Sequence, residues 1–113
     1  GQNGNNRIYG VGGDNFLLGG SGNDTIYGGP GNNGIYGLAG NDRLLGGAGN
    51  DVLYGGPGND SIYGIGGTNR ILTGPGNNIV LAGAGYDRIY GGDGFDPAII
   101  QPGDKAYNID VLF

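Results

Sequence analysis

The feature that most constrains this chain is a nine-residue register that runs through residues 1–99 without an insertion or a deletion. The eleven consecutive nonapeptides read GQNGNNRIY, GVGGDNFLL, GGSGNDTIY, GGPGNNGIY, GLAGNDRLL, GGAGNDVLY, GGPGNDSIY, GIGGTNRIL, TGPGNNIVL, AGAGYDRIY and GGDGFDPAI. Position 4 is always Gly, position 6 is always Asp or Asn, and position 8 is Ile, Leu or Val except at Ala98. Fixed places for glycine indicate a repeat architecture rather than a disordered linker.

Each nonapeptide combines the residues of a turn with those of a short strand. Positions 1–6 are rich in Gly, Asn and Asp, which tolerate positive φ and turn conformations. In positions 7–9 the aliphatic residue at position 8 points to one face of a strand, and its two neighbours point to the other. Two nonapeptides therefore predict one 18-residue coil with two facing strands, and successive coils stack at the strand spacing of about 4.8 Å.

The stack predicts a thin core, because each coil contributes only two residues from position 8. The expected core residues are Ile8, Ile26, Leu44, Ile62 and Val80 on one side, and Leu17, Ile35, Leu53, Ile71 and Ile89 on the other. The fold class is therefore all-β, a two-sheet β-solenoid of about five and a half coils over residues 1–99.

The two ends of the register differ. The period breaks at Ile100, and residues 100–113 end in a strand-like segment that we expect to be a C-terminal cap. The chain begins in phase at Gly1 with no N-terminal cap and no Met, which favours a piece of a longer protein. Open strand edges at the first coil would allow end-to-end self-association.

Composition excludes several kinds of site. The 113 residues include no Cys, His, Met, Trp or Glu, so disulfides, thiolate or imidazole metal sites and His-based catalysis are excluded. The net charge of −5 argues against nucleic acid and anionic membranes as partners, and for cations. No apolar run approaches the length that spans a membrane, so membrane insertion is not expected.

Stacking also aligns the residues at position 6 in two columns. Within each column, neighbours in successive coils lie about 5 Å apart. One column contains Asn6, Asp24, Asp42, Asp60, Asn78 and Asp96, and the other contains Asn15, Asn33, Asp51, Asn69 and Asp87. Like charges at that spacing repel and oppose folding, whereas a hard divalent cation between them would turn the repulsion into attraction. Calcium suits such a site, because it takes about six to eight oxygens, including backbone carbonyls, in irregular geometry.

The motif G-G-x-G-N-D-x-U-x, where U is a large aliphatic residue, resembles the nonapeptide of the RTX (repeats-in-toxin) family. The resemblance covers residues 1–99 and implies a parallel β-roll that binds Ca²⁺. It also implies a secreted, extracellular bacterial protein. The residues at the family's carboxylate position are Asp24, Asp42, Asp51, Asp60, Asp87 and Asp96.

Asn replaces Asp at position 6 in five of the eleven nonapeptides. Its neutral oxygen could still be a ligand, so Asn6, Asn33, Asn69 and Asn78 are included among the candidate metal ligands. The strongest sites are expected between Asp24 and Asp42 and between Asp42 and Asp60. Mixed pairs should be weaker or empty, and the pair Asn15 with Asn33 should be empty. The Asn residues also predict that some β-roll structure persists without calcium, held by amide ladders.

Two further features of the register leave alternatives open. Val11, Leu38 and Ile65 replace Gly at position 2, so either the turn is altered there or these side chains lie outward in a row. Positions 7 and 9 carry Arg, Tyr and Leu, which fit ladder packing on solvated faces. The same rows could also form a docking surface for self-association.

Three other functions are alternatives to calcium binding. The equivalent carboxylates lack the asymmetry that separates a catalytic acid from a nucleophile, so the chain is not expected to be an enzyme, although a longer parent could be an enzyme or a toxin. An ice-binding role is disfavoured, because the Asn row at position 5 has no accompanying Thr row. A self-associating or adhesive module remains the main alternative.

Overall fold

The computed structural model describes residues 3–112, which form thirteen short strands and no helix. The strands are β1 (Arg7–Tyr9), β2 (Phe16–Leu18), β3 (Thr25–Tyr27), β4 (Gly34–Tyr36), β5 (Arg43–Gly47), β6 (Val52–Tyr54), β7 (Ser61–Ile65), β8 (Arg70–Leu72), β9 (Ile79–Leu81), β10 (Arg88–Tyr90), β11 (Pro97–Ile99), β12 (Lys105–Tyr107) and β13 (Asp110–Leu112). In residues 1–99 each strand begins at position 7 of a nonapeptide, as the register predicts.

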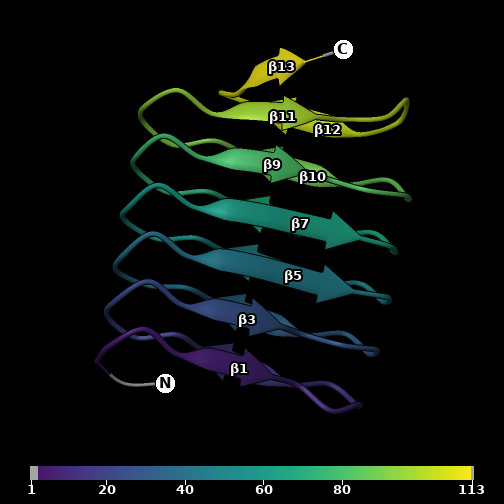
Figure 1. Ribbon diagram of the computed structural model, residues 1–113. Helices are drawn as coiled ribbons and strands as arrows, with labels where there is room; N and C mark the ends of the chain where they lie inside the picture. Colours follow the sequence, from purple (N-terminus) through teal and green to yellow (C-terminus); the bar gives the residue numbers. More distant parts are fainter. Residues whose placement is uncertain (1–2, 113) are drawn as a thin grey trace.

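The strands alternate between two parallel sheets, so the chain winds as a flattened two-sided coil (Figure 1). One sheet has the order β1-β3-β5-β7-β9-β11-β13, and the other has the order β12-β10-β8-β6-β4-β2. Pairing along the regular part joins residues 18 apart, for example Ile8 with Ile26 and Ile35 with Leu53. The predicted parallel β-solenoid is therefore confirmed, and it measures 35 × 30 × 15 Å.

The core lies between the two sheets and is built from position 8. Ile26, Ile35, Leu44, Leu53, Ile62, Ile71, Val80 and Ile89 are fully buried, together with Ala82 and Ala98. Ile8 and Leu17, in the first described coil, are partly buried and pack against this cluster. The predicted core is thus confirmed. Ala82 and Ala98 extend it near the C-terminal end of the stack.

Residues after the regular register extend both sheets. β12 pairs with β10, with Lys105 beside Arg88, and β13 pairs with β11, with Asp110 beside Pro97. Ile100, Ala106 and Ile109 pack against the core. The prediction that residues 100–113 form a separate cap stays a prediction.

The glycine at position 4 has both a conformational and a steric reason. Gly40 and Gly58 have φ of 110° and 127°, which L side chains rarely adopt. A Cβ at Gly58 would also lie against the carbonyl oxygen of Gly40 in the preceding coil. The positive φ is common to position 4 of every nonapeptide, and the steric conflict recurs from Gly22 onward but is absent at Gly4 and Gly13, which have no preceding coil.

Replacing Gly58 by Ala is therefore expected to destabilise the fold by about 2–3 kcal/mol, from left-handed backbone strain plus overpacking. The matched control is Gly34→Ala in β4, where φ is not positive and a Cβ would meet only side-chain atoms, the nearest on Phe16 at 3.3 Å. That control should be neutral or slightly stabilising. Urea unfolding of the two variants measures the difference, and equal losses would contradict this explanation of position 4.

The bulky residues at position 2 resolve into two cases. Leu38 and Ile65 keep positive φ, of 72° and 77°, so the turn is unchanged and the side chains lie at the surface. At Val11 φ is not positive, and Gly12 at position 3 has a positive φ of 123° instead, so that turn is altered. The three do not form one row, because Val11 follows β1 and Ile65 ends β7 in one sheet, whereas Leu38 follows β4 in the other sheet and so lies at the opposite edge.

Within residues 3–112, no helix has the length and the apolar character needed to cross a membrane.

Candidate metal sites in the turns

The residues at position 6 form two continuous columns, one at each edge of the flattened coil. The main-chain N–H of Asp24 donates to Asp42 Oδ1 at 2.8 Å, and that of Asp42 donates to Asp60 Oδ1 at 2.8 Å. In the other column, the N–H of Asp51 donates to Asn69 Oδ1 at 2.8 Å. The predicted stacking of these side chains is thus present, and hydrogen bonds to their oxygens join adjacent coils.

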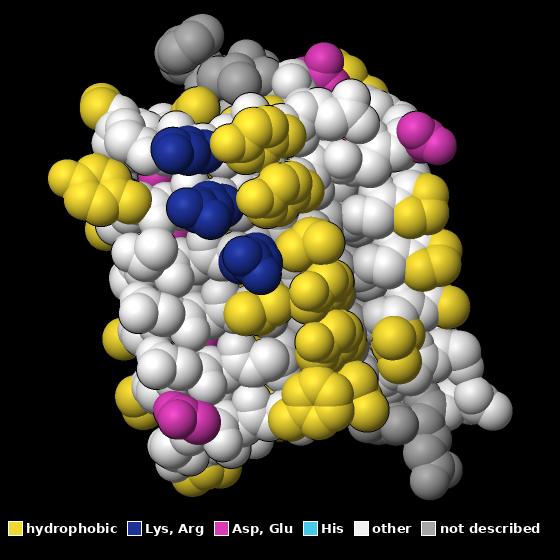
Figure 2. Space-filling view, turned by 180° about the vertical axis from the view of Figure 1, so that it is seen from behind, with side chains coloured by type: hydrophobic (Ala, Val, Ile, Leu, Met, Phe, Trp, Pro, Cys, Tyr) yellow, Lys and Arg dark blue, Asp and Glu magenta, His cyan; other side chains and the backbone are white. Residues whose placement is uncertain are grey.

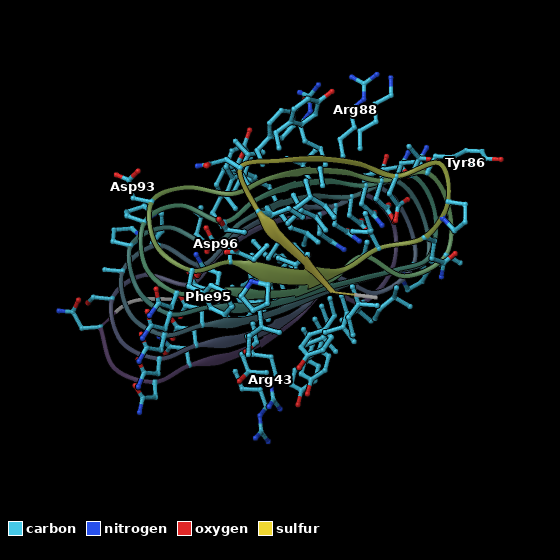
Figure 3. The ribbon with its side chains drawn as sticks, turned by 90° about the horizontal axis from the view of Figure 1, so that it is seen from above. Arg43, Tyr86, Arg88, Asp93, Phe95 and Asp96 are labelled. Atoms are coloured by element: carbon cyan, nitrogen blue, oxygen red, sulfur yellow. The ribbon has the colours of Figure 1, made fainter. Side chains whose placement is uncertain are left out.

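Almost all of these side chains are buried. The buried members are Asp24, Asn33, Asp42, Asp51, Asp60, Asn69, Asn78, Asp87 and Asp96, whereas Asn6 and Asn15 are partly exposed. Figure 3, which looks along the stack, shows Asp96 inside the coil, while Arg43 and Arg88 project from its opposite faces.

Each buried carboxylate uses only one of its two oxygens. Oδ1 accepts the main-chain N–H of the preceding coil, but Oδ2 is buried with no hydrogen-bond partner. Among the described residues this holds for Asp24, Asp42, Asp51, Asp60, Asp87 and Asp96. An acceptor buried without a partner costs about 1–3 kcal/mol, and more if it is charged. A cation close to these six oxygens would therefore stabilise the fold.

The unpartnered oxygens of Asp24, Asp42, Asp51 and Asp60 lie in small cradles beside the glycine at position 1. A Cβ built on Gly37 would be 2.5 Å from Asp42 Oδ2 and 2.8 Å from the carbonyl oxygen of Gly55 in the next coil. On Gly46 it would be 2.7 Å from Asp51 Oδ2 and 2.9 Å from Gly64 O. In these four turns a carboxylate oxygen and a backbone carbonyl thus converge on a space that glycine leaves open, whereas the turn of Asp87 has Ala82 at the same position.

Burial disfavours the charged form of these carboxyl groups. It raises the pKa of Asp60 to about 7 and that of Asp42 to about 6. The pKa of Asp87 is also raised to about 6, and that of Asp51 is raised, with burial again the largest cause. Hydrogen bonds from the preceding coil oppose the rise, while neighbouring carboxylates add to it at Asp42 and Asp60. The charged form therefore needs a nearby cation.

The Asn turns have the same shape but different polarity. Asn33 Oδ1 accepts the main-chain N–H of Asn15 at 2.9 Å, which fixes the orientation of the amide. Asn33 Nδ2 then donates to Gly29 O at 3.1 Å and Gly31 O at 3.3 Å in its own turn. A Cβ on Gly28 would be 2.9 Å from this nitrogen, so Nδ2 occupies the place that Oδ2 has in an Asp turn.

The donor set fits a hard cation such as calcium. It consists of carboxylate oxygens and backbone carbonyls, which are the ligands that calcium takes. Among residues 3–112, no three His, Cys, Asp or Glu side chains converge on a common point. An ion in these turns would therefore have to draw a large share of its ligands from the backbone.

Two residues that join the columns lie outside the regular register. The main-chain N–H of Asp87 donates to Asp104 Oδ1 at 2.8 Å, and that of Asp96 donates to Asp110 Oδ2 at 3.0 Å. The nine-residue register does not predict Asp104 or Asp110 as members of the columns, because shortened turns precede them. An Asp directly before a three-residue strand could have identified Asp104, which precedes β12, whereas Asp110 is itself the first residue of β13.

The outer face of the sheet that contains β12 carries exposed cations in a row. Arg70, Arg88 and Lys105 occupy consecutive rungs. Figure 2 shows a row of Lys and Arg side chains beside a column of hydrophobic ones. The hydrophobic column includes the stacked rings of Tyr36 and Tyr54, whose centroids are 4.6 Å apart. Leu72 and Tyr54 line a hollow of about 440 Å³ on this face.

The net charge of the chain therefore differs from the charge that its accessible surface presents. Six of the ten aspartates are buried in the turns, whereas all five Lys and Arg residues are exposed. The expectation that nucleic acid does not bind was based on the net charge and stays a prediction.

Comparison with known families agrees with the turn geometry. A model of the RTX calcium-binding nonapeptide repeat, in four copies, matches residues 1–35, 36–71 and 63–96. No curated protein and no solved structure gives a significant match. The repeat is a structural calcium-binding module and not a catalytic one. With its eleven nonapeptides, its two parallel sheets and its aspartate turns, this chain belongs to the family of RTX calcium-binding nonapeptide repeats.

Proposed function

We propose that this chain is a structural module whose β-roll is stabilised by calcium bound in its aspartate turns. The observation that carries the proposal is the set of six buried Oδ2 atoms without a hydrogen-bond partner. In the absence of a cation these oxygens add an unfavourable desolvation energy to the folded state. Ion binding would remove that cost and would join neighbouring coils.

The column that contains Asp24, Asp42 and Asp60 is the best candidate for the tightest sites. Its three carboxylates are adjacent, and both Asp24 and Asp42 donate a main-chain N–H to the carboxylate of the next coil. Oδ2 of each would hold the ion together with backbone carbonyls of the turns. In the other column, Asp51 has Asn33 and Asn69 as neighbours, so fewer charges surround it, and Asp87 lies between Asn69 and Asp104.

Calcium should raise the thermal stability of the chain, because a ligand that binds only the folded state stabilises it by mass action. The test compares melting by circular dichroism in excess chelator, in millimolar Ca²⁺ and in millimolar Mg²⁺. At about 100 times the dissociation constant, each site contributes about 2.7 kcal/mol, which shifts the melting temperature of a domain of this size by about 10 °C or more.

Magnesium is the matched control, because it demands near-octahedral geometry and gives up its water reluctantly. It should shift the melting temperature much less than calcium does. Identical melting curves in calcium and in chelator, with no binding heat by calorimetry, would contradict the proposed function.

Secretion is part of the same proposal. RTX repeat proteins are typically secreted, and extracellular calcium near the millimolar range suits modular sites of modest affinity. Self-association remains a second candidate function, supported by the half-buried Tyr and Leu column on the outer face and by Tyr9, which is 56% exposed in the first described coil.

A further inference from the structure

Asp and Asn at position 6 place different atoms at the same point of the turn. In the Asp turns that point holds Oδ2, which is an acceptor without a partner, and in the Asn turns it holds Nδ2, which is a donor. The surrounding carbonyl oxygens are acceptors in both kinds of turn. The exchange of one atom therefore decides whether the turn is satisfied by itself or needs a cation.

Asn78 shows this most fully. Its Nδ2 lies 3.1 Å from Gly74 O, 3.3 Å from Gly76 O and 2.9 Å from Asp96 Oδ1. The first two acceptors belong to its own turn, and the third belongs to the next coil. The partly positive amide group thus bridges two coils through oxygens, which is the role that a cation would have between carboxylates.

Asn15 makes the same bridge in the other column. Its Nδ2 donates to Gly13 O at 3.2 Å in its own turn and lies 3.1 Å from Asn33 Oδ1 in the next coil. Asn69 is a simpler case, in which Nδ2 donates to Gly66 O at 3.1 Å. In each of these turns the nitrogen, and not the oxygen, faces the carbonyl oxygens.

We propose that the Asn residues at position 6 are built-in replacements for calcium rather than weak calcium ligands. The Nδ2 groups of Asn15, Asn33, Asn69 and Asn78 make their turns independent of metal, and calcium binding is confined to the Asp turns. This inference rests on the proposed function and revises the expectation that Asn33, Asn69 and Asn78 contribute ligand oxygens.

The arrangement of the two residue types gives the roll a graded metal dependence. Asp24, Asp42 and Asp60 form an uninterrupted run that ends at Asn78, whereas Asp51 is bounded by Asn33 and Asn69. Metal-free turns therefore alternate with metal-dependent turns in the second column from Asn33 to Asp87. Such a roll keeps partial structure in chelator and completes it when calcium is added.

Two reciprocal substitutions test the proposal on the intact chain. Asp42→Asn should raise the melting temperature in chelator by about 5 °C, because it replaces an unpartnered acceptor with a donor. Calorimetry of this variant should show fewer calcium equivalents than the parent chain does. Asn33→Asp should lower the melting temperature in chelator by a similar amount, should regain it in calcium and should add one calcium equivalent.

The matched control is Asn32→Asp, which makes the same charge change in the same turn. Asn32 is exposed, and its Oδ1 accepts the main-chain N–H of Asn50, as Asp14 Oδ1 does for Asn32 itself. This variant should leave both the melting temperature in chelator and the calcium stoichiometry unchanged.

The outcomes separate this inference from the proposed function. If the parent chain binds no calcium, the proposed function fails, whatever the variants do. If the parent binds calcium but Asn33→Asp behaves like Asn32→Asp, the inference is overturned. A lower melting temperature of Asp42→Asn in chelator would also overturn it, because the amide would then fail to satisfy the turn.

Discussion

In excess chelator, the folded chain should lose stability steadily as the pH rises from about 4 to about 7. The carboxyl groups of Asp42, Asp60 and Asp87 have folded-state pKa values of about 6, 7 and 6, against an ordinary value of 3.8. Between these values the folded chain binds more protons than the unfolded chain, so the free energy of unfolding falls with rising pH. Below the ordinary pKa the full stability is present, and above about pH 7 the loss is complete.

The expected effect is large, because each pKa unit corresponds to about 1.4 kcal/mol and three groups contribute. Calcium should reverse the slope over the same range, since a bound cation favours the ionised carboxylate. Urea unfolding at pH 4.5, 6 and 7.5, with and without calcium, measures both slopes.

Matched variants identify the groups responsible for this pH dependence. Replacing Asp42, Asp60 and Asp87 together by Asn should flatten the dependence in chelator, whereas replacing the exposed Asp93 by Asn should leave it in place. A metal-free stability that increases from pH 4.5 to pH 7.5 would show that these carboxylates are not desolvated as the fold indicates.

Leu53→Ala should cost about 3–5 kcal/mol, which is a large part of the stability of a domain of this size. Leu53 is fully buried and lies between Ile35 and Ile71 on the neighbouring rungs. Each coil contributes only two residues to the core, so a cavity there has few neighbours that could move to fill it. Loss of the methyl groups should therefore appear almost entirely as a lower free energy of unfolding.

Leu81→Ala is the control for this core substitution. Leu81 is at position 9 of its nonapeptide and is 37% exposed on the outer face of β9. Its truncation should cost less than about 1 kcal/mol. Urea unfolding in saturating calcium compares the two, and a cost at Leu53 no larger than at Leu81 would mean that the facing position-8 residues do not hold the sheets together.

The sequence was sufficient to predict the fold because one period governs everything in residues 1–99. Position 8 repeats as a buried aliphatic residue, so the register alone identifies Ile26, Leu44 and Ile62 as neighbours in one sheet. The same register aligns Asp24 with Asp42. These features depend only on the alternation of side chains along a strand and on the constant coil length.

The different hydrogen bonding of the two oxygens in each carboxylate could not be predicted in this way. That Oδ1 of Asp42 accepts a main-chain N–H while Oδ2 has no partner depends on side-chain torsions within the turn. The orientation of the Asn33 amide follows from the same contacts, so its nitrogen could not be distinguished from its oxygen at the sequence level. Burial of the aspartates, which leaves a surface rich in exposed cations, is likewise a property of the stacked turns.

The shortened coil at the C-terminal end was missed for a different reason. Asp104 and Asp110 join the two columns although their spacings to Asp87 and Asp96 depart from 18 residues. A strict nine-residue period cannot detect a turn that has lost residues, whereas hydrogen bonding between rungs tolerates the loss.

The most direct test of the whole account is anomalous X-ray diffraction from crystals of this chain grown in calcium. We expect anomalous density next to Oδ2 in the aspartate turns, most strongly between Asp24 and Asp60, and none in the turns of Asn33 and Asn69. Aspartate side chains turned away from any density, or equal density in the Asn turns, would contradict it.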